Sequence, residues 1–296
     1  MQPERQVQLT TNKTGNSKKI KKNLLIEREY YMEEVTVVKK GRVLEILLNR
    51  PKVNAIDLAT SRKLGDAFVL LRDDPELWVG ILTAAGDRIF SAGWDLKSLN
   101  QGEMSLDDWW ENDYGAGGFA GLTEMWDLNK PVIAALNGLA IGGGFEMAMA
   151  CDLIIAAEHV EFGLPELPLG IVPDAGAIQR LPRRIPYNVA MEMYLLGRRM
   201  TASEAQGYGF VNKVVSKDIL METAREWANQ IAESAPLALQ TVKEVLRAIE
   251  GDTIEQSFQT MRKADLPVYR KMLGSDDAKE GVKAFVEKRK PDFKGL

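Results

Sequence analysis

The stretch that decides the fold is residues 132–173, VIAALNGLAIGGGFEMAMACDLIIAAEHVEFGLPELPLGIVP. The apolar run 132–136 predicts a buried strand, which ends at the Asn-Gly turn 137–138. Three glycines, 142–144, then lead into FEMAMA, which predicts the start of a helix. Glycine lets the backbone approach a ligand closely, and the first amides of a helix point outward along its axis. This stretch can therefore hold a negatively charged oxygen.

Two carboxylates lie in the same stretch. Glu146 falls just inside the expected helix, and Glu166 follows in LPELPLG, where Pro165 stiffens the backbone. Two acids in apolar surroundings beside an anion-binding turn predict proton transfer. The alternative is structural: Glu146 complements the helix dipole, and Glu166 is an exposed loop acid. The apolar neighbours expected around Glu166 are Leu164, Leu167 and Leu169.

A second turn strengthens the functional interpretation. SAGWDLK, residues 91–97, follows the strand-like run VGILT at 79–83 and again contains small residues. Two separate turns can each offer one backbone amide to a single oxygen. A glycine triplet alone is more often a packing device, so it is the combination of the turns and the carboxylates that indicates a site.

Composition restricts the function classes. The chain has 296 residues, with 27% charged and 45% hydrophobic, which is ample for a buried core. A net charge of −4 argues against a dedicated nucleic-acid binder. Cys151 is the single cysteine, so no internal disulfide can form, and no apolar run reaches the roughly 18 residues of a membrane span. We expect a soluble, cytoplasmic protein.

The first 31 residues differ from the rest. They hold five Lys and two Arg against three Glu and lack both a long apolar segment and a cleavage pattern, so they are not a secretory signal. We expect a disordered basic extension over residues 1–31. Because Met32 opens the regular part of the chain, a start codon assigned too early is one explanation, and an arm that binds nucleic acid or a partner is another.

The remainder alternates strands and helices. Runs at 35–38 and 43–48 predict a hairpin, and Asp57 is a candidate N-cap for a helix that stops at 73–75. Further on, a capping box at 201–204 and a strand at 211–215 precede helices with one apolar face, of which one opens at Pro236 and is closed by Gly251. This pattern predicts a β/α core followed by a helical C-terminal part.

Residues 98–129 form an irregular, glycine-rich segment with many aromatic side chains. Such a segment after an anion-binding turn is typical of a substrate-pocket wall or lid. The alternative is that these rings are ordinary core or interface residues. The candidates for an acyl pocket are Trp109, Trp110, Tyr114 and Trp126.

Several motifs in a fixed order carry a resemblance to a known family: FSAGWDL, KPVIAALNG, GGGFE, FGLPELPLGIVPDAG and AFVEKRKPDF. Together they resemble the crotonase (enoyl-CoA hydratase/isomerase) superfamily from about Val35 to the C-terminus. The resemblance implies an α/β fold, a spiral of repeated ββα units over 32–200 with the active site, and a helical part over 201–296 that builds a homotrimer, alone or paired into a hexamer.

The resemblance also implies roles for individual residues. The amides of Trp94 and Gly143 would form an oxyanion hole for the thioester oxygen, and Glu146 and Glu166 would hold one water between them. Their proximity should keep one proton shared by the pair. Coenzyme A, part of the substrate rather than a cofactor, would contact Lys52, Ala55, Ala92, Asp95, Leu96, Lys97 and, from a neighbouring chain, Phe285 and Lys288. No metal is implied, and the lone His159 is expected at the surface.

Among subfamilies, the resemblance is greatest to carnitinyl-CoA dehydratases, because of Trp94, GGFAGLTEMWDLNKP, GIVPDAG and GRRM. The pair Trp109-Trp110 departs from that pattern. Asp174 is a possible additional site residue, since isomerases of this superfamily use an aspartate there. The leading hypothesis is a hydro-lyase on a short enoyl-CoA. The alternatives are an enoyl- or dienoyl-CoA isomerase, a generic short-chain hydratase, and a non-enzymatic RNA-binding crotonase.

Overall fold

The computed structural model describes residues 28–32, 34–100 and 111–296, and its centre is a seven-stranded sheet. The first three strands of this sheet are antiparallel, and the others are parallel. The parallel strands are apolar because both faces are covered. The strand order is β1 (Arg28–Met32), β2 (Val35–Lys40), β3 (Val43–Leu48), β4 (Val79–Ala84), β6 (Val132–Leu136), β8 (Leu153–Ala157) and β11 (Lys213–Val215).

A second sheet of four short strands completes a spiral. After β4, β6 and β8 the chain adds a strand to the small sheet, then a helix, and returns to the large one. The repeated ββα units expected from the resemblance are therefore confirmed. The order in the small sheet is β10 (Met200–Thr201), β9 (Glu161–Gly163), β7 (Leu139–Ile141) and β5 (Ile89–Ser91).

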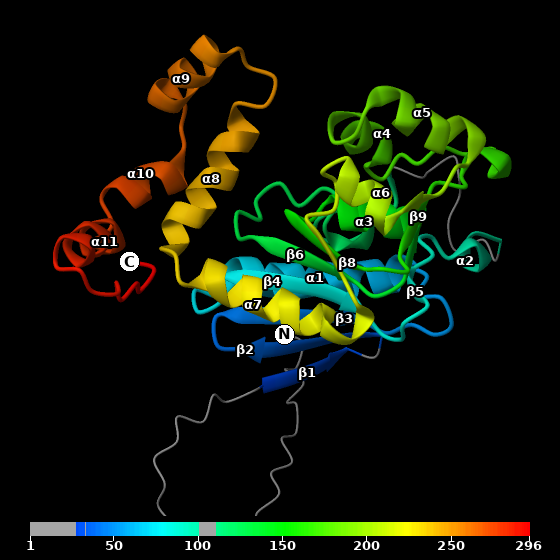
Figure 1. Ribbon diagram of the computed structural model, residues 1–296, viewed down its shortest axis with the longest axis horizontal. Coiled ribbons are helices and arrows are strands. Elements are labelled where there is room, and N and C mark those ends of the chain that lie inside the picture. Colours follow the sequence, from blue (N-terminus) through cyan, green and yellow to red (C-terminus); the bar gives the residue numbers. More distant parts are fainter. Residues whose placement is uncertain (1–27, 33, 101–110) are drawn as a thin grey trace, which may run out of the picture.

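Two long helices cover the large sheet, α7 in front of it and α1 behind it in Figure 1. Helix α1 (Leu58–Asp73) begins where predicted, since the Asp57 carboxylate accepts the Thr60 amide at 2.8 Å. Helix α7 (Leu220–Ala232) is tied to β3 by Arg225, whose guanidinium donates to both oxygens of Glu45 at 2.6 and 3.0 Å.

Shorter helices connect the strands and border the site. The capping box predicted at Thr201 is present, with its hydroxyl accepting the Glu204 amide. These elements are α2 (Leu96–Asn100), α3 (Gly143–Met149), α4 (Ala177–Arg180), α5 (Tyr187–Leu196), α6 (Ala202–Gly207) and the 3-10 turns Phe119–Gly121, Leu167–Leu169, Leu181–Arg183 and Lys217–Ile219.

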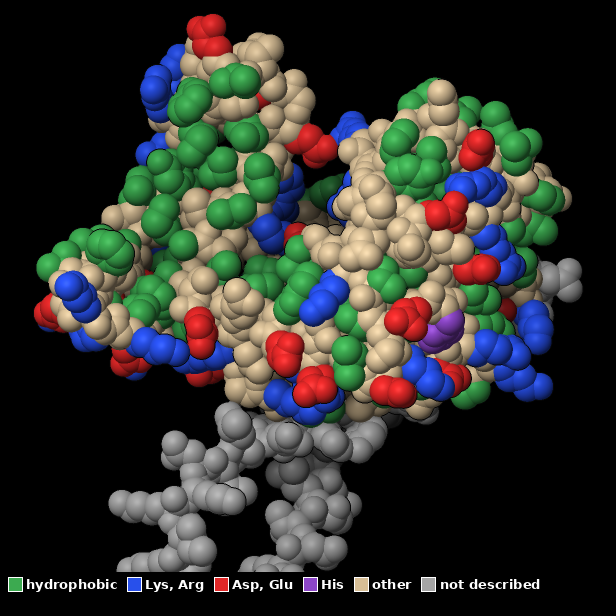
Figure 2. Space-filling view, viewed as in Figure 1, with side chains coloured by type: hydrophobic (Ala, Val, Ile, Leu, Met, Phe, Trp, Pro, Cys, Tyr) green, Lys and Arg blue, Asp and Glu red, His purple; other side chains and the backbone are tan. Residues whose placement is uncertain are grey.

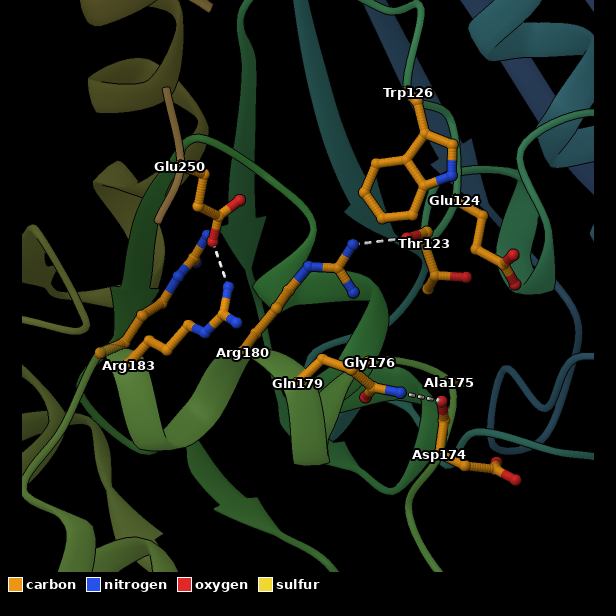
Figure 3. Close-up of a pocket in the computed structure, with 11 residues that line it drawn as sticks. Thr123, Glu124, Trp126, Asp174, Ala175, Gly176, Gln179, Arg180, Arg183 and Glu250 are labelled. Atoms are coloured by element: carbon orange, nitrogen blue, oxygen red, sulfur yellow. Dashed lines mark hydrogen bonds and ion pairs between the residues drawn. The ribbon is translucent and has the colours of Figure 1, made fainter. Parts of the chain in front are cut away.

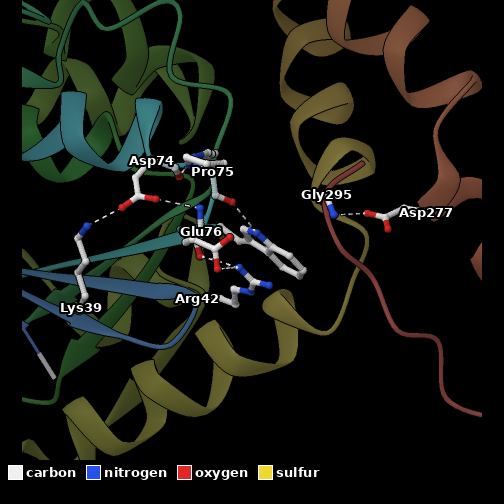
Figure 4. Close-up of polar contacts among 9 residues, drawn as sticks. Lys39, Arg42, Asp74, Pro75, Glu76, Asp277 and Gly295 are labelled. Atoms are coloured by element: carbon white, nitrogen blue, oxygen red, sulfur yellow. Dashed lines mark hydrogen bonds and ion pairs between the residues drawn. The ribbon is translucent and has the colours of Figure 1, made fainter. Parts of the chain in front are cut away.

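The C-terminal helices form an arm that projects away from the sheets (Figure 1). Its elements are α8 (Pro236–Ala248), α9 (Ile254–Lys263), α10 (Pro267–Leu273) and α11 (Asp276–Val286). The last residues fold back on α11, where the buried Asp277 carboxylate accepts the amides of Lys294 and Gly295, each at 2.7 Å (Figure 4). The same view shows Lys39 paired with Asp74 at 2.5 Å, which joins β2 to the end of α1.

Three boundaries differ from the sequence prediction. The extension was expected to reach residue 31, but β1 pairs with β2 from Arg28, because 28–32 can add an edge strand to the hairpin. Residues 1–27 lie outside the described part. The strand predicted at 211–215 begins only at Lys213, and α8 ends at Ala248, before Gly251. Among the described residues, no helix is long and apolar enough to cross a membrane.

Candidate active site

A small cavity of about 80 Å³ lies between the start of α3, the loop after β5 and the segment after β9. Its walls come from stretches that are far apart in sequence but that the spiral brings to one place. The cavity brings together seven of the predicted site residues: Ala92, Trp94, Leu96, Gly143, Glu146, Glu166 and Asp174.

Glu146 is buried in α3, with 3% of its surface exposed. Its Oε1 accepts the Ala177 amide at 2.9 Å, and the Ala177 carbonyl accepts the Tyr194 hydroxyl at 2.9 Å. Burial, with smaller contributions from the nearby Glu166 and Asp174 carboxylates, raises the pKa of Glu146 to about 8, although the Ala177 amide opposes this shift. Glu146 lies in the first turn of α3 but is buried, so it is not a surface acid.

Glu166 is also buried, with 8% exposed, so it is not an exposed loop acid. Its Oε2 has no hydrogen-bond partner among the described residues. Burial and the Asp174 charge raise the pKa of Glu166 to about 7. Gly142 makes room for it, because a Cβ there would lie 2.7 Å from Oε1 of Glu166. Leu169, expected to help bury this carboxyl, is instead 55% exposed at the cavity mouth.

The loop 91–95 packs directly against the start of α3. Gly93 has φ +78°, and a Cβ there would lie 2.5 Å from the Gly143 nitrogen. The Ser91 hydroxyl donates to the Asn54 carbonyl at 2.7 Å and accepts the Gly93 amide at 3.1 Å. These contacts hold the backbone on both sides of the cavity at fixed positions, which is what a preorganised anion site requires.

Internal contacts of Arg50 hold in place the segment predicted to bind coenzyme A. Arg50 donates to the Ala55 carbonyl at 3.0 Å and forms ion pairs with Asp57 at 2.8 Å and Asp95 at 2.7 Å. Despite its partial burial, this contact with Arg50 holds the pKa of Asp95 below its ordinary value. Asp95 thus stabilises the loop internally. Two other predicted contacts, Lys52 and Lys97, are exposed; Lys52 lies in a turn before Ala55, and Lys97 lies in helix α2.

The aromatic residues divide into two groups. Tyr114 packs edge-on against Trp94, with ring centroids 5.6 Å apart, and Phe119 stacks on Trp94 at 5.2 Å. Trp126 is 62% exposed and lines an adjoining cavity of about 450 Å³, where the Arg180 guanidinium lies 5.8 Å from its ring centroid (Figure 3). Trp109 and Trp110 lie outside the described residues.

Two predicted contacts lie away from this cavity. Phe285, on α11, is 86% exposed, and Lys288 follows the end of that helix in the arm. Within one chain they do not reach the cavity residues, as Figure 1 shows for the arm and α3. His159 is exposed, as expected, with Nε2 2.7 Å from the Asp87 carbonyl oxygen.

Three further residues near the site were not singled out from the sequence. They are Glu124 and Arg180 in the adjoining cavity and Tyr194 behind Glu146. Glu124 lies in TEMWDLNK, one of the stretches that carry the subfamily resemblance. The residues around it in the sequence do not indicate that its carboxylate lies near the site. Only the folded chain brings it into the same cavity as Asp174.

Comparisons with known proteins identify the family. The sequence model of the family described as enoyl-CoA hydratase/isomerase matches residues 38–296. Carnitinyl-CoA dehydratase from Proteus mirabilis (strain HI4320) is 54% identical over 256 residues, covering 86% of this chain and 96% of the relative. The Salmonella arizonae protein of the same name is 51% identical, covering 89% of this chain and 99% of the relative.

Solved structures give the same result. The enoyl-CoA hydratase from Mycobacterium tuberculosis H37Rv superposes with a TM-score of 0.80 at 39% identity, covering 89% of this chain and 99% of that chain. An enoyl-CoA hydratase from Bacillus anthracis superposes with a TM-score of 0.79 at 35% identity, covering 89% of this chain and 100% of that chain.

Proposed function

The chain belongs to the enoyl-CoA hydratase/isomerase family, and we propose that it catalyses the reversible addition of water to crotonobetainyl-CoA, which gives carnitinyl-CoA. The observation that carries this proposal is the buried pair Glu146 and Glu166, both with raised pKa values, in one cavity with Gly143 and Trp94. The names of the relatives, at 51–54% identity, support the acyl group.

The proposed chemistry needs one shared proton. The ionised carboxylate takes a proton from water as the oxygen bonds to the β-carbon, and the π electrons move toward the thioester oxygen. The protonated carboxyl then delivers its proton to the α-carbon, and dehydration reverses these steps. The raised pKa values of both groups favour a singly protonated pair near neutral pH.

The thioester oxygen gains negative charge in this reaction. We place it at the amides of Gly143 and Trp94, since the contact between Gly93 and the Gly143 nitrogen holds the two turns together. In other enzymes, removal of one such donor costs about 2.7–4 kcal/mol. The steps use only side chains and backbone amides of the chain, together with water.

Coenzyme A would extend from Ala92 and Leu96 along the segment that contains Lys52 and Ala55 and that Arg50 holds in place. Lys97 is the nearby cation for its phosphates. Asp95 contributes by holding Arg50 and the loop in place, and Phe285 and Lys288 would come from a neighbouring chain.

The proposed assembly is a homotrimer or a dimer of trimers. Large apolar side chains remain exposed along the arm, more than an isolated chain would leave in contact with water (Figure 2). They include Val242, Leu246, Ile254, Phe258, Leu273, Val282, Phe285 and Val286.

The test is turnover of crotonobetainyl-CoA and crotonyl-CoA by the purified protein, followed as loss of the enoyl thioester absorbance. We expect hydration of both, with a higher kcat/KM for crotonobetainyl-CoA. Preference for crotonyl-CoA would overturn the acyl group and leave the hydratase class intact. No loss of absorbance with either thioester would overturn both.

A further inference from the structure

We propose that Asp174, assisted by Glu124, is the counter-charge that makes this site select a cationic acyl group. The inference rests on the proposed hydratase function and adds the residues that would determine its specificity. It begins from the place of Asp174, which lines both the small cavity with Glu146 and Glu166 and the larger cavity with Glu124 and Trp126.

The chemistry of the substrate fixes where its charge must lie. In crotonobetainyl-CoA the quaternary nitrogen is one methylene beyond the β-carbon. With the thioester oxygen at Gly143 and the β-carbon at the two glutamates, the ammonium group lies beyond them, away from coenzyme A. Asp174 occupies the boundary with the larger cavity, which has the volume that three methyl groups require.

A quaternary ammonium has no N–H group, so it is recognised by aromatic faces and by nearby negative charge. The described residues on this side supply both. Tyr114 packs on Trp94, and the Asp174 and Glu124 charges both act on the Tyr114 hydroxyl, whose pKa is raised mainly by burial. Trp94 and Asp174 line the small cavity, and Tyr114 lines a further cavity together with Glu124 and Trp126, so the two carboxylates and the rings lie on the same side of the site.

The charges of the larger cavity are separated along its length. Arg183 and Glu250 form an ion pair at one end of the cavity, next to α8 (Figure 3). Glu124 and Asp174 lie at the other end. Arg180 lies between the two ends and donates to the Thr123 carbonyl at 2.5 Å. The acidic end is the one that meets the catalytic cavity. A cation that passes Asp174 thus enters the acidic end of this cavity, and Arg180 interacts with both Glu146 and Glu124.

Asp174 also protects the shared proton. An ammonium group close to the glutamate pair would favour ionisation of both carboxyls and remove the proton that the α-carbon needs. A fixed carboxylate at Asp174 offsets that charge, and it raises the pKa of both Glu146 and Glu166 in the free enzyme. The other charged group that acts on Glu146 is Arg180, and Glu124 acts in turn on Arg180.

The experiment compares the cation with a neutral substrate of the same shape. In 5,5-dimethylhex-2-enoyl-CoA a quaternary carbon replaces the nitrogen. The preference is the ratio of kcat/KM for crotonobetainyl-CoA to that for this isostere. We expect Asp174→Asn to lower the preference at least about tenfold, and Glu124→Gln to lower it less, because Glu124 is exposed to solvent. Asp174→Glu, which keeps the charge, should retain most of it.

Glu250→Gln is the matched control. It removes a carboxylate from the same cavity, but at the end where Glu250 is paired with Arg183, so the preference should not change. A second readout, independent of turnover, is calorimetric binding of 4-trimethylammoniobutyryl-CoA against 5,5-dimethylhexanoyl-CoA. The saturated cation should bind more tightly to the wild type, and Asp174→Asn should remove that difference.

Two outcomes would overturn the proposal. Equal losses on both enoyl thioesters in Asp174→Asn, with the binding difference intact, would mean that Asp174 serves the proton transfer instead. A wild type that hydrates both substrates without preference would show that no counter-charge acts. If the wild type fails to hydrate crotonobetainyl-CoA at all, the proposed acyl group fails as well, and this is visible before any variant is made.

Discussion

At the scale of single residues, the proposed reaction depends on two carboxyl groups that are buried away from water. Among the residues that the structure describes, neither Glu146 nor Glu166 is hydrogen-bonded to a cationic side chain, and burial is the main cause of each raised pKa. This environment costs folding free energy but keeps a proton available for transfer.

We predict that Glu146→Gln and Glu166→Gln each lower kcat at least ~100-fold, the scale of lost general acid–base catalysis. Because neither side chain is placed at coenzyme A, the affinity for free coenzyme A should stay within about twofold. The measurement is steady-state kinetics together with a binding titration. Near-normal turnover in either variant would contradict a mechanism that needs both groups.

The same burial predicts a pH dependence of stability. The native pKa values, about 8 and about 7, lie above the ordinary value of 4.5. Between these limits the native state holds more protons than the unfolded state, so this contribution to stability is present below pH 4.5 and is lost as pH rises toward 8. Glu146→Gln cannot ionise, so it should raise Tm relative to the wild type by at least ~2 °C at pH 8.5, and less at pH 5. An equal shift at both pH values would contradict the assignment.

At the scale of elements, the site depends on the turn that begins α3. Gly142 has φ +54°, and the space beside it is filled by the Glu166 carboxylate. We predict that Gly142→Ala lowers kcat by about 100-fold, because the new methyl displaces that carboxylate as well as straining the backbone. The control is Gly197→Ala, at φ +62° with no atom within 4 Å of the added Cβ. Gly197 lies in the left-handed region, with ψ 23°, where alanine is less strained than at Gly142, whose ψ is −128°. Gly197→Ala should keep its activity; equal loss in both variants would rule out the steric argument.

Local patterns predicted much of this element. The strand 132–136, the glycine turn and Glu146 on the first turn of α3 follow from residues next to each other, and their positions are confirmed. Two features could not be predicted from local patterns. Asp174 and Glu124, 50 positions apart, line one cavity, and Asp95 pairs with Arg50, 45 positions away. Only the folded spiral brings these residues together. Likewise β1 has no strong strand pattern of its own and depends on the edge of β2.

At the scale of the whole molecule, the arm is the part whose purpose a single chain does not explain. Val282, Phe285 and Val286 on α11 are 68%, 86% and 74% exposed.

We predict that the protein has three or six times the molar mass of one chain in light scattering. Val282→Asp should shift it toward the single chain and raise KM, since Phe285 and Lys288 then lose their neighbour's site. Lys283→Ser is the control, because Lys283 is also exposed but lies about 100° around α11 from Val282. A wild type that is monomeric and fully active would contradict the proposed assembly.

In the proposed reaction, two carboxyl groups in this cavity add water across a double bond. Turnover of crotonobetainyl-CoA in ¹⁸O-labelled heavy water, analysed by mass spectrometry, tests it most directly. Hydration by the two glutamates should give one ¹⁸O at the β-carbon and one deuterium at the α-carbon of each carnitinyl-CoA formed, and both labels should be lost in step in Glu146→Gln and Glu166→Gln. Deuterium without ¹⁸O, together with a migrated double bond, would contradict hydration and identify an isomerase.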